Sequence, residues 1–286
     1  MDKFQLHFFK EKTRDLDIAA TLAFFEVIEG VTIEMDERSV RINYKHPRLG
    51  YEARFLIMPK SQVRDIYRLS PRYLDLNFQL ELPILTPDYF AEHIFSIVKR
   101  LVDKFDLFVY QDYFDDVLPY RIDLVTKIFN VMKERYLELN PKLFSEENYI
   151  LVPKHKLNAI LRYMDDNFEL QKHYREAKTY VPFYYFLVNG DGELRVSFEW
   201  KYDTLTVIPP FIDFIFLNRG EEVTIIKYDE FLNESNKYLD DVPGFLKDTK
   251  VVPTKQLRRI NRILKKKKFS KVHEVLTKVD HHLLID

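Results

Sequence analysis

The sequence predicts an α+β protein of two domains, residues 1–145 and 146–286. Two kinds of pattern support this class: segments in which apolar and polar residues alternate, which are typical of strands, and segments with an apolar stripe of helical period. Both kinds occur in both halves of the chain. A third observation separates the halves, because Asn140-Pro141 ends a long helical segment and places the boundary around residues 140–152.

The first domain is expected to be a two-layer sandwich of an antiparallel sheet and helices. Its strands are expected at residues 4–9, 31–36, 40–45, 51–57, 73–82 and 105–110, and its helices at 15–29, 86–104 and 118–139. Gly30 is expected to end the first helix, since glycine readily adopts the left-handed conformation of a helix C-terminus. The strand at 105–110 follows a helix almost directly, which indicates a right-handed crossover back into the sheet.

Two local patterns in this domain are especially clear. From Leu74 to Leu82, leucine or phenylalanine stands at every even position and a polar residue at every odd one, which predicts a strand with one buried and one wet face. The helix that follows has a defined start, because Thr86 can cap it, Pro87 suits its first position and Asp88 suits its first turn.

The second domain is expected to combine a helix, a β-meander and C-terminal helices. The residues Asn-Gly-Asp-Gly at 189–192 are a strong hairpin signal between two strand-like segments. The expected strands are 183–188, 194–200, 205–208, 211–217 and 223–228, and the expected helices are 153–168, 229–239 and 254–264. Residues 272–279 fit a helix, with a strand as the alternative.

Composition excludes several classes of site. The chain has no cysteine, so disulfides, thiolate catalysis and cysteine-ligated metal centres are ruled out. No glycine occurs from Tyr51 to Asn189, so this stretch has no glycine-dependent phosphate loop. Nucleotide-binding fingerprints and a GxSxG setting for serine do not occur either, and no cofactor is predicted. The longest near-apolar stretch, residues 205–217, is too short to span a bilayer, and the expected compartment is the cytosol.

Residues 255–271 form the strongest positive feature of the sequence. They contain nine basic and no acidic residues, whereas the rest of the chain has 35 basic and 45 acidic residues and a net charge of −10. The candidate phosphate contacts are Arg258, Arg259, Arg262, Lys265, Lys266, Lys267 and Lys268. A helix with these side chains opposite its apolar face fits sequence-independent binding of nucleic acid. An anionic membrane surface, an acidic partner and plain solvation are the alternatives.

An acidic loop follows the strand expected at 105–110. It contains Asp112, Asp115 and Asp116, with Asp106 nearby. Ligands often bind at the carboxyl ends of strands, and carboxylate oxygens are the ligands that Mg²⁺ prefers, so the loop is a candidate metal site for phosphoryl chemistry. A solvated loop that leads into a helix is the alternative interpretation.

The eight histidines show no metal-binding spacing. None lies four residues from another, and the motif HExxH does not occur. His281 and His282 are adjacent near the end of the sequence, but no recognisable metal-binding motif surrounds them. We therefore expect structural or solvent-exposed roles for the histidines.

These patterns lead to three hypotheses for function. The first is a non-catalytic adaptor that binds a protein partner, because no catalytic set is recognisable and the chain is rich in aromatic and unevenly distributed charged residues. Its candidate surfaces are an aromatic run at residues 180–186 and a polar sheet face that includes Arg41, Asn43 and Arg54. The first alternative is a nucleic-acid-associated protein that uses residues 255–271. The second is a metal-dependent enzyme that uses residues 106–116.

Overall fold

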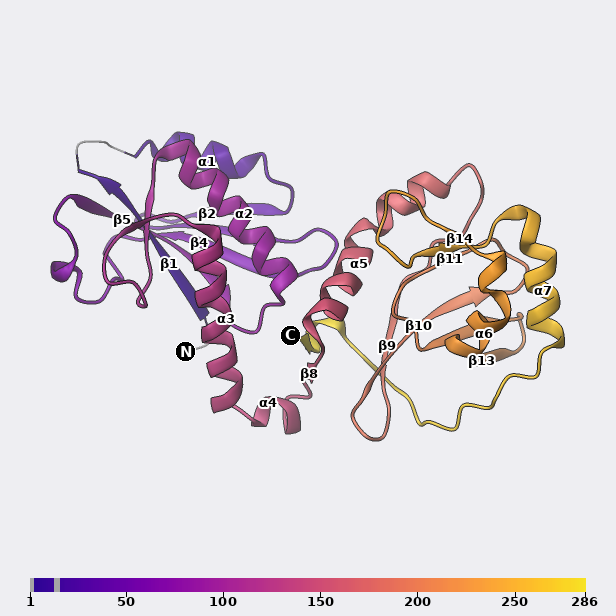
Figure 1. Cartoon of the computed structure of the whole chain (residues 1–286). Coiled ribbons are helices and arrows are strands. Elements are labelled where there is room, and N and C mark those ends of the chain that lie inside the picture. The colour runs from indigo at the N-terminus through magenta and orange to yellow at the C-terminus, as the bar shows by residue number, and fades with distance from the viewer. Residues whose placement is uncertain (1–2, 13–15) are drawn as a thin grey trace. The chain divides into compact units, whose positions relative to one another are not determined.

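The computed structural model describes residues 3–12 and 16–286, apart from the side chain of Lys266, and has the α+β fold that the sequence predicts. The chain divides into two compact units, Met1–Glu147 (unit 1) and Asn148–Asp286 (unit 2), each with its own sheet and helices (Figure 1). Within the described ranges, no helix combines the length and the apolar character that crossing a membrane requires.

Unit 1 contains a seven-stranded antiparallel sheet in the order β2-β3-β4-β5-β1-β6-β7. Its strands are β1 (Lys3–Glu11), β2 (Val31–Met35), β3 (Val40–Lys45), β4 (Glu52–Ile57), β5 (Tyr73–Pro83), β6 (Phe108–Tyr110) and β7 (Leu118–Pro119). Its helices are α1 (Ile18–Glu26), η1 (Ile66–Arg68), α2 (Asp88–Phe105), α3 (Ile122–Leu139) and α4 (Lys142–Ser145). β5 and β6 both pair with β1, so α2 carries the chain across β1 between them.

The helices α1, α2 and α3 of unit 1 pack on this sheet through aromatic rings. Phe4 of β1 lies 5.8 Å from Phe95 of α2 and 5.6 Å from Phe129 of α3. Phe25 of α1 lies 4.7 Å from Phe55 of β4. All five rings are buried, and the two edge-to-face pairs that Phe4 forms add about 0.5–1.5 kcal/mol each to the gain from burial. The two-layer arrangement therefore follows from phenylalanines at alternate strand positions.

β5 keeps the predicted alternation only in its second half. Its register with β1 jumps between the pairs Phe8–Phe78 and Phe9–Asp75, and Asn77 takes a positive φ of 52°. At this point β5 has two residues more than β1, so its even-numbered residues stay on the same face on both sides of the irregularity. Leu74, predicted to be buried, is nevertheless 48% exposed, whereas Phe78, Leu80 and Leu82 are buried.

The first helix and Gly30 also differ from the prediction. α1 begins after Asp17, whose side chain accepts a hydrogen bond from a helical amide, and it ends at Glu26. Asp15, the predicted start, lies outside the described residues. Gly30 does not cap the helix but turns the chain into β2 with φ +86°, and a Cβ there would lie 2.2 Å from the carbonyl oxygen of Lys45. Close approach of β3 therefore requires this glycine.

Two other helices begin later than predicted. α2 has Pro87 as its N-cap, so Thr86 does not cap it, and Asp88 is its first residue. α3 begins at Ile122, because residues 118–119 pair with β6 as a short strand.

Unit 2 contains three separate sheets, in the orders β13-β12-β10-β9-β16, β11-β15-β14 and β17-β8. Its strands are β8 (Ile150–Leu151), β9 (Tyr185–Val188), β10 (Leu194–Lys201), β11 (Val207–Ile208), β12 (Phe214–Asn218), β13 (Val223–Lys227), β14 (Asp240–Asp241), β15 (Lys250–Val251), β16 (Thr277–Val279) and β17 (Leu284–Ile285). Its helices are α5 (Lys154–Tyr174), α6 (Tyr228–Ser235), η2 (Asn236–Tyr238), η3 (Thr254–Gln256), α7 (Leu257–Lys266) and η4 (His281–Leu283).

The predicted β-meander is wrong in one respect. β9 with β10 and β12 with β13 are antiparallel pairs, but β10 and β12 run parallel. The reason is that β11, which lies between them in the sequence, leaves the main sheet and pairs with β15. Residues 277–279 form a strand that pairs with β9. The helix predicted for residues 272–279 is therefore wrong in this part, and the strand that was the alternative is confirmed.

The aromatic run at residues 180–186 is divided between the core and the surface. Tyr184 is buried 5.0 Å from Tyr163 of α5, whose hydroxyl donates to the carbonyl of Pro182 at 2.9 Å. Phe183 points outward and is 63% exposed. The fully buried Trp200 of β10 packs on α6, so the main sheet and its helices share one core.

Candidate functional site

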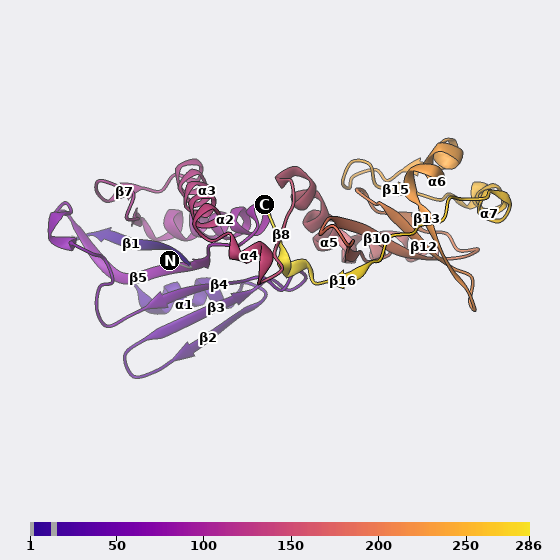
Figure 2. The ribbon, with the colours of Figure 1, turned by 90° about the horizontal axis from the view of Figure 1, so that it is seen from below.

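The basic segment is docked on unit 2 and does not project as a free tail. Ile260 and Leu264, one turn apart on α7, are fully buried, and Figure 2 shows α7 beside α6. Arg219 donates to the carbonyl of Leu264 at 2.9 Å, which satisfies one of the carbonyls that a helix end leaves without a partner. Asn261 donates to Asp203 at 2.5 Å. Both contacts hold α7 in one orientation.

The face of α7 opposite its buried edge carries cations. Residues 258, 262 and 265 are four and seven positions apart and therefore share a stripe of the helix. Arg258, Arg262 and Lys265, which we call the basic strip, are exposed. None of them forms an ion pair or hydrogen bond with another residue that the structure describes. Three positive charges are thus held on a fixed helix without a nearby counter-charge.

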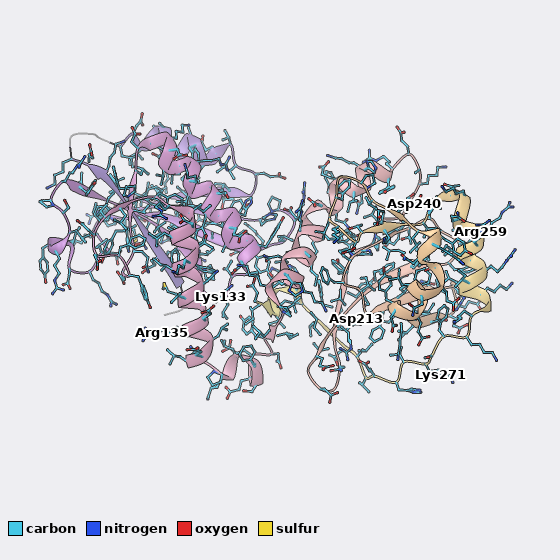
Figure 3. All side chains as sticks on the ribbon, viewed as in Figure 1. Lys133, Arg135, Asp213, Asp240, Arg259 and Lys271 are labelled. Atoms are coloured by element: carbon cyan, nitrogen blue, oxygen red, sulfur yellow. The ribbon has the colours of Figure 1, made fainter. Side chains whose placement is uncertain are left out.

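The remaining predicted cations are less uniform. The guanidinium of Arg259 lies 5.5 Å from the ring centroid of Tyr238, and Figure 3 labels this residue on α7. Lys267 forms an ion pair with Glu234 of α6. Lys268 is exposed just beyond the helix. The side chain of Lys266 lies outside the described part of the chain.

The helix dipole accounts for only part of this distribution. Cations are favourable in the last turn of a helix, so Lys265 stabilises α7. Arg258 and Arg259 lie in the first turn, where the dipole is positive and cations are unfavourable. The first turn of α7 has no acidic residue to balance them. Folding of α7 therefore does not explain why arginines occupy these positions.

The acidic loop of unit 1 does not bring its four predicted carboxylates together. Asp106 takes the left-handed C-cap position of α2, with φ 51°. Asp116 accepts hydrogen bonds from the amides of Ser70 at 2.9 Å and Val117 at 2.7 Å, and so fastens two loops to each other. Asp112 and Asp115 are exposed.

A metal site in this loop has no support from the geometry. In the described ranges, the only set of three or more Asp, Glu or His ligand atoms within 4.8 Å of one another belongs to Asp280, His281 and His282 in unit 2.

Two of the hollows of unit 1 adjoin residues named in the sequence analysis. The larger, of about 630 Å³, lies on the polar sheet face that the sequence predicts, where Arg41 and Arg54 face a surface that also contains Glu34 and Glu52. Neither arginine forms an ion pair with a described residue. The smaller, of about 280 Å³, has apolar walls and is lined in part by Arg135 of α3 (Figure 3).

A buried ion pair in unit 1 escaped the sequence analysis. Lys133 of α3, with a side chain 4% exposed, pairs with Asp88 in the first turn of α2 and donates to the carbonyl of Thr86 at 3.3 Å. Its ammonium group also lies 5.3 Å from the ring centroid of Phe129. The available signal was a lysine next to the apolar stripe of a helix, which does not reveal its partner 45 residues away.

No protein family model matches this chain, and neither curated proteins nor solved structures give a match. Function therefore has to be inferred from the chain's own residues.

Proposed function

We propose that this protein binds nucleic acid through unit 2, with the basic strip of α7 in contact with backbone phosphates. The observation that carries the proposal is that Arg258, Arg262 and Lys265 are exposed on one face of a docked helix and are not neutralised by any described residue. Such cations favour a polyanion, because each phosphate that they neutralise releases a condensed counterion.

The dimensions of the strip suit a phosphate backbone. Its three residues extend over seven helical steps, about 10 Å at a rise of 1.5 Å per residue. Duplex DNA carries one negative charge for about every 1.7 Å of its axis, so the strip can face several phosphates at once. Arginine is well suited to this role, since its guanidinium donates two parallel hydrogen bonds to one phosphate.

We expect this binding to be independent of base sequence. Contacts to phosphates position a protein on nucleic acid but carry no direct information about the bases. The proposal keeps the cytosolic location expected from the sequence.

Fluorescence anisotropy with labelled single-stranded and duplex oligonucleotides of mixed sequence tests the proposal. Three phosphate contacts give an expected slope of about −2.7 in a plot of log affinity against log salt concentration for duplex DNA. The variant Arg258→Ala/Arg262→Ala/Lys265→Ala is expected to bind roughly tenfold or more weakly at 50 mM salt and to show a flatter slope.

A matched control removes three other cations that also lack an ion pair with any described residue. The variant Arg41→Ala/Arg54→Ala/Arg135→Ala changes the net charge by the same amount but leaves α7 intact. It is expected to keep nearly all of the affinity. Equal losses in the two variants, or the lack of salt-dependent binding by the wild type, would overturn the proposal. Fluorescence of Trp200, the only tryptophan, reports whether unit 2 remains folded.

Binding of a protein partner is the second candidate function, and the larger hollow of unit 1 favours it. Positive and negative side chains alternate there, and such a mixture complements a charged protein surface better than a uniform polyanion. The variant Arg41→Glu/Arg54→Glu should lose a co-purifying protein in affinity purification and retain nucleic acid binding. Recovery of the same partners by this variant would remove the hollow from consideration.

A further inference from the structure

Asp280, His281 and His282 bring three potential metal ligands to one point. His282 Nδ1 lies 2.7 Å and His281 Nδ1 lies 3.4 Å from the same oxygen, Asp280 Oδ1. Zinc binds nitrogen and oxygen ligands at about 2.0–2.2 Å, so the ligand atoms of a tetrahedral site lie roughly 3–3.5 Å apart. Both imidazole nitrogens therefore lie at nearly this separation from the carboxylate oxygen, and one ligand atom from each of the three residues lies within 4.8 Å of the other two.

The fold holds the backbone of this histidine pair in place, which the sequence did not reveal. β16, just before Asp280, is bonded to β9, and β17, just after η4, is bonded to β8. Asp280 also caps the short helix η4, since its Oδ1 accepts from the amide of His282 at 2.8 Å. The backbone that carries all three ligands is consequently held at both ends, and little chain entropy remains to be lost when an ion binds.

The surroundings of the three side chains suit an ion that enters from solvent. The ring of His281 lies 6.4 Å from that of Phe186, and its side chain is 19% exposed. The side chains of His282 and Asp280 are 44% and 65% exposed, so water can complete the coordination. Two imidazoles and one carboxylate favour zinc, nickel or copper over magnesium or calcium, which prefer an all-oxygen set.

We propose that Asp280 Oδ1 and the Nδ1 atoms of His281 and His282 bind one divalent transition-metal ion, with zinc as the ion that such a donor set most often holds. Binding replaces the hydrogen bond between His282 and Asp280, and both imidazoles then carry their proton on Nε2. The site is independent of the basic strip on α7.

Isothermal titration of the full-length, untagged chain with zinc chloride tests this site. The wild type is expected to bind one ion per chain. Asp280→Asn is expected to lower the affinity at least tenfold while keeping η4 intact, because asparagine is an equally good N-cap. His281→Asn/His282→Asn is expected to abolish binding. Cobalt as a spectroscopic substitute should give an absorption band that these variants lose.

His273→Asn is the matched control, since it removes an exposed histidine from the segment just before β16. This variant is expected to bind zinc like the wild type. Failure of the wild type to bind zinc would overturn the proposal. So would an affinity for zinc that is unchanged in Asp280→Asn and in His281→Asn/His282→Asn, or one that falls equally in His273→Asn. Unchanged Trp200 fluorescence in Asp280→Asn shows that a loss of binding does not come from unfolding of unit 2.

Discussion

Lys133 in unit 1 and Arg258 in unit 2 are two cationic helix residues in opposite situations. Lys133 is buried and is neutralised by Asp88, whereas Arg258 is exposed and has no ion-pair partner among the described residues. In the interior an unpaired charge costs several kcal/mol, so a partner is obligatory there. At the surface water solvates the charge, and a partner is optional. Charge thus fixes the contact between α2 and α3 in unit 1, whereas on α7 it remains available for an external ligand.

The largest expected effect comes from breaking the buried pair. Lys133→Ala leaves Asp88 buried without its partner and should lower the free energy of unfolding by about 3–5 kcal/mol. Urea denaturation followed by circular dichroism measures this loss. Lys133→Met/Asp88→Leu removes both charges and should lose much less. A double variant as unstable as the single one would show that packing, rather than charge, accounts for the effect.

The next largest effect comes from a comparison of two glycines, one packed against a neighbouring backbone and one with no atom near its Cβ position. Gly30→Ala in unit 1 combines a positive φ with a Cβ only 2.2 Å from a backbone oxygen. Gly220→Ala in unit 2 has φ +98° but no atom within 4 Å of the added carbon. We expect the second change to cost about 1–2 kcal/mol from backbone strain alone. The first should cost roughly 1–3 kcal/mol more from overpacking.

Urea midpoints of the two glycine variants measure this difference. Equal losses would mean that the turn before β2 relaxes away from β3 without cost.

A smaller effect separates stability from binding on α7. Arg258→Glu places an acid in the first turn and should raise the free energy of unfolding by about 0.3–1 kcal/mol. Lys265→Glu places an acid in the last turn and should lower it by a similar amount. Both variants should weaken nucleic acid binding, because each reverses one charge of the basic strip. Thermal denaturation and anisotropy together test the pair. A loss of stability in Arg258→Glu would contradict our account of the dipole.

The smallest effect concerns pH and the buried His7 of β1. Burial lowers the pKa of His7, although Asp75 and Asp112 act in the opposite direction. The unfolded chain therefore binds a proton at a higher pH than the folded chain. The stability that His7 contributes is present above its unfolded pKa of about 6.5 and decreases as the pH falls below that value.

Urea midpoints at pH 7.5 and 5.5 test this expectation for His7. His7→Gln should show a smaller decrease than the wild type between the two pH values. An equal decrease would show that His7 does not contribute to the pH dependence.

The sequence was a good guide wherever structure depends on neighbouring residues. The strands of unit 1 and the two faces of α7 follow directly from the period of their apolar residues. Prediction failed where the arrangement of a strand depends on its pairing with a segment that is distant in the sequence. β5 changes register against β1, and β12 lies parallel to β10 because β11 pairs elsewhere.

For the candidate sites too, the sequence predicted which residues are close along the chain but not which contacts they form. The basic strip was recognisable because nine cations stand close together in the sequence. Only the structure shows that Lys267 pairs with Glu234 of α6, whereas Arg258, Arg262 and Lys265 have no ion pair with a described residue. The four aspartates of the acidic loop are near one another in the sequence, yet Asp106 and Asp116 serve as a helix cap and a loop clamp instead of meeting as ligands.

The sequence by itself determined the α+β class, the buried face of most strands in unit 1 and the positive charge of α7. These properties follow from local backbone geometry, since side chains alternate along a strand and recur every 3.6 residues in a helix. Only the tertiary structure decided which groups meet: Lys133 with Asp88, and the ligand atoms of Asp280, His281 and His282 between two anchored strands. Those encounters depend on strand pairing and helix docking between distant segments, which no local pattern encodes.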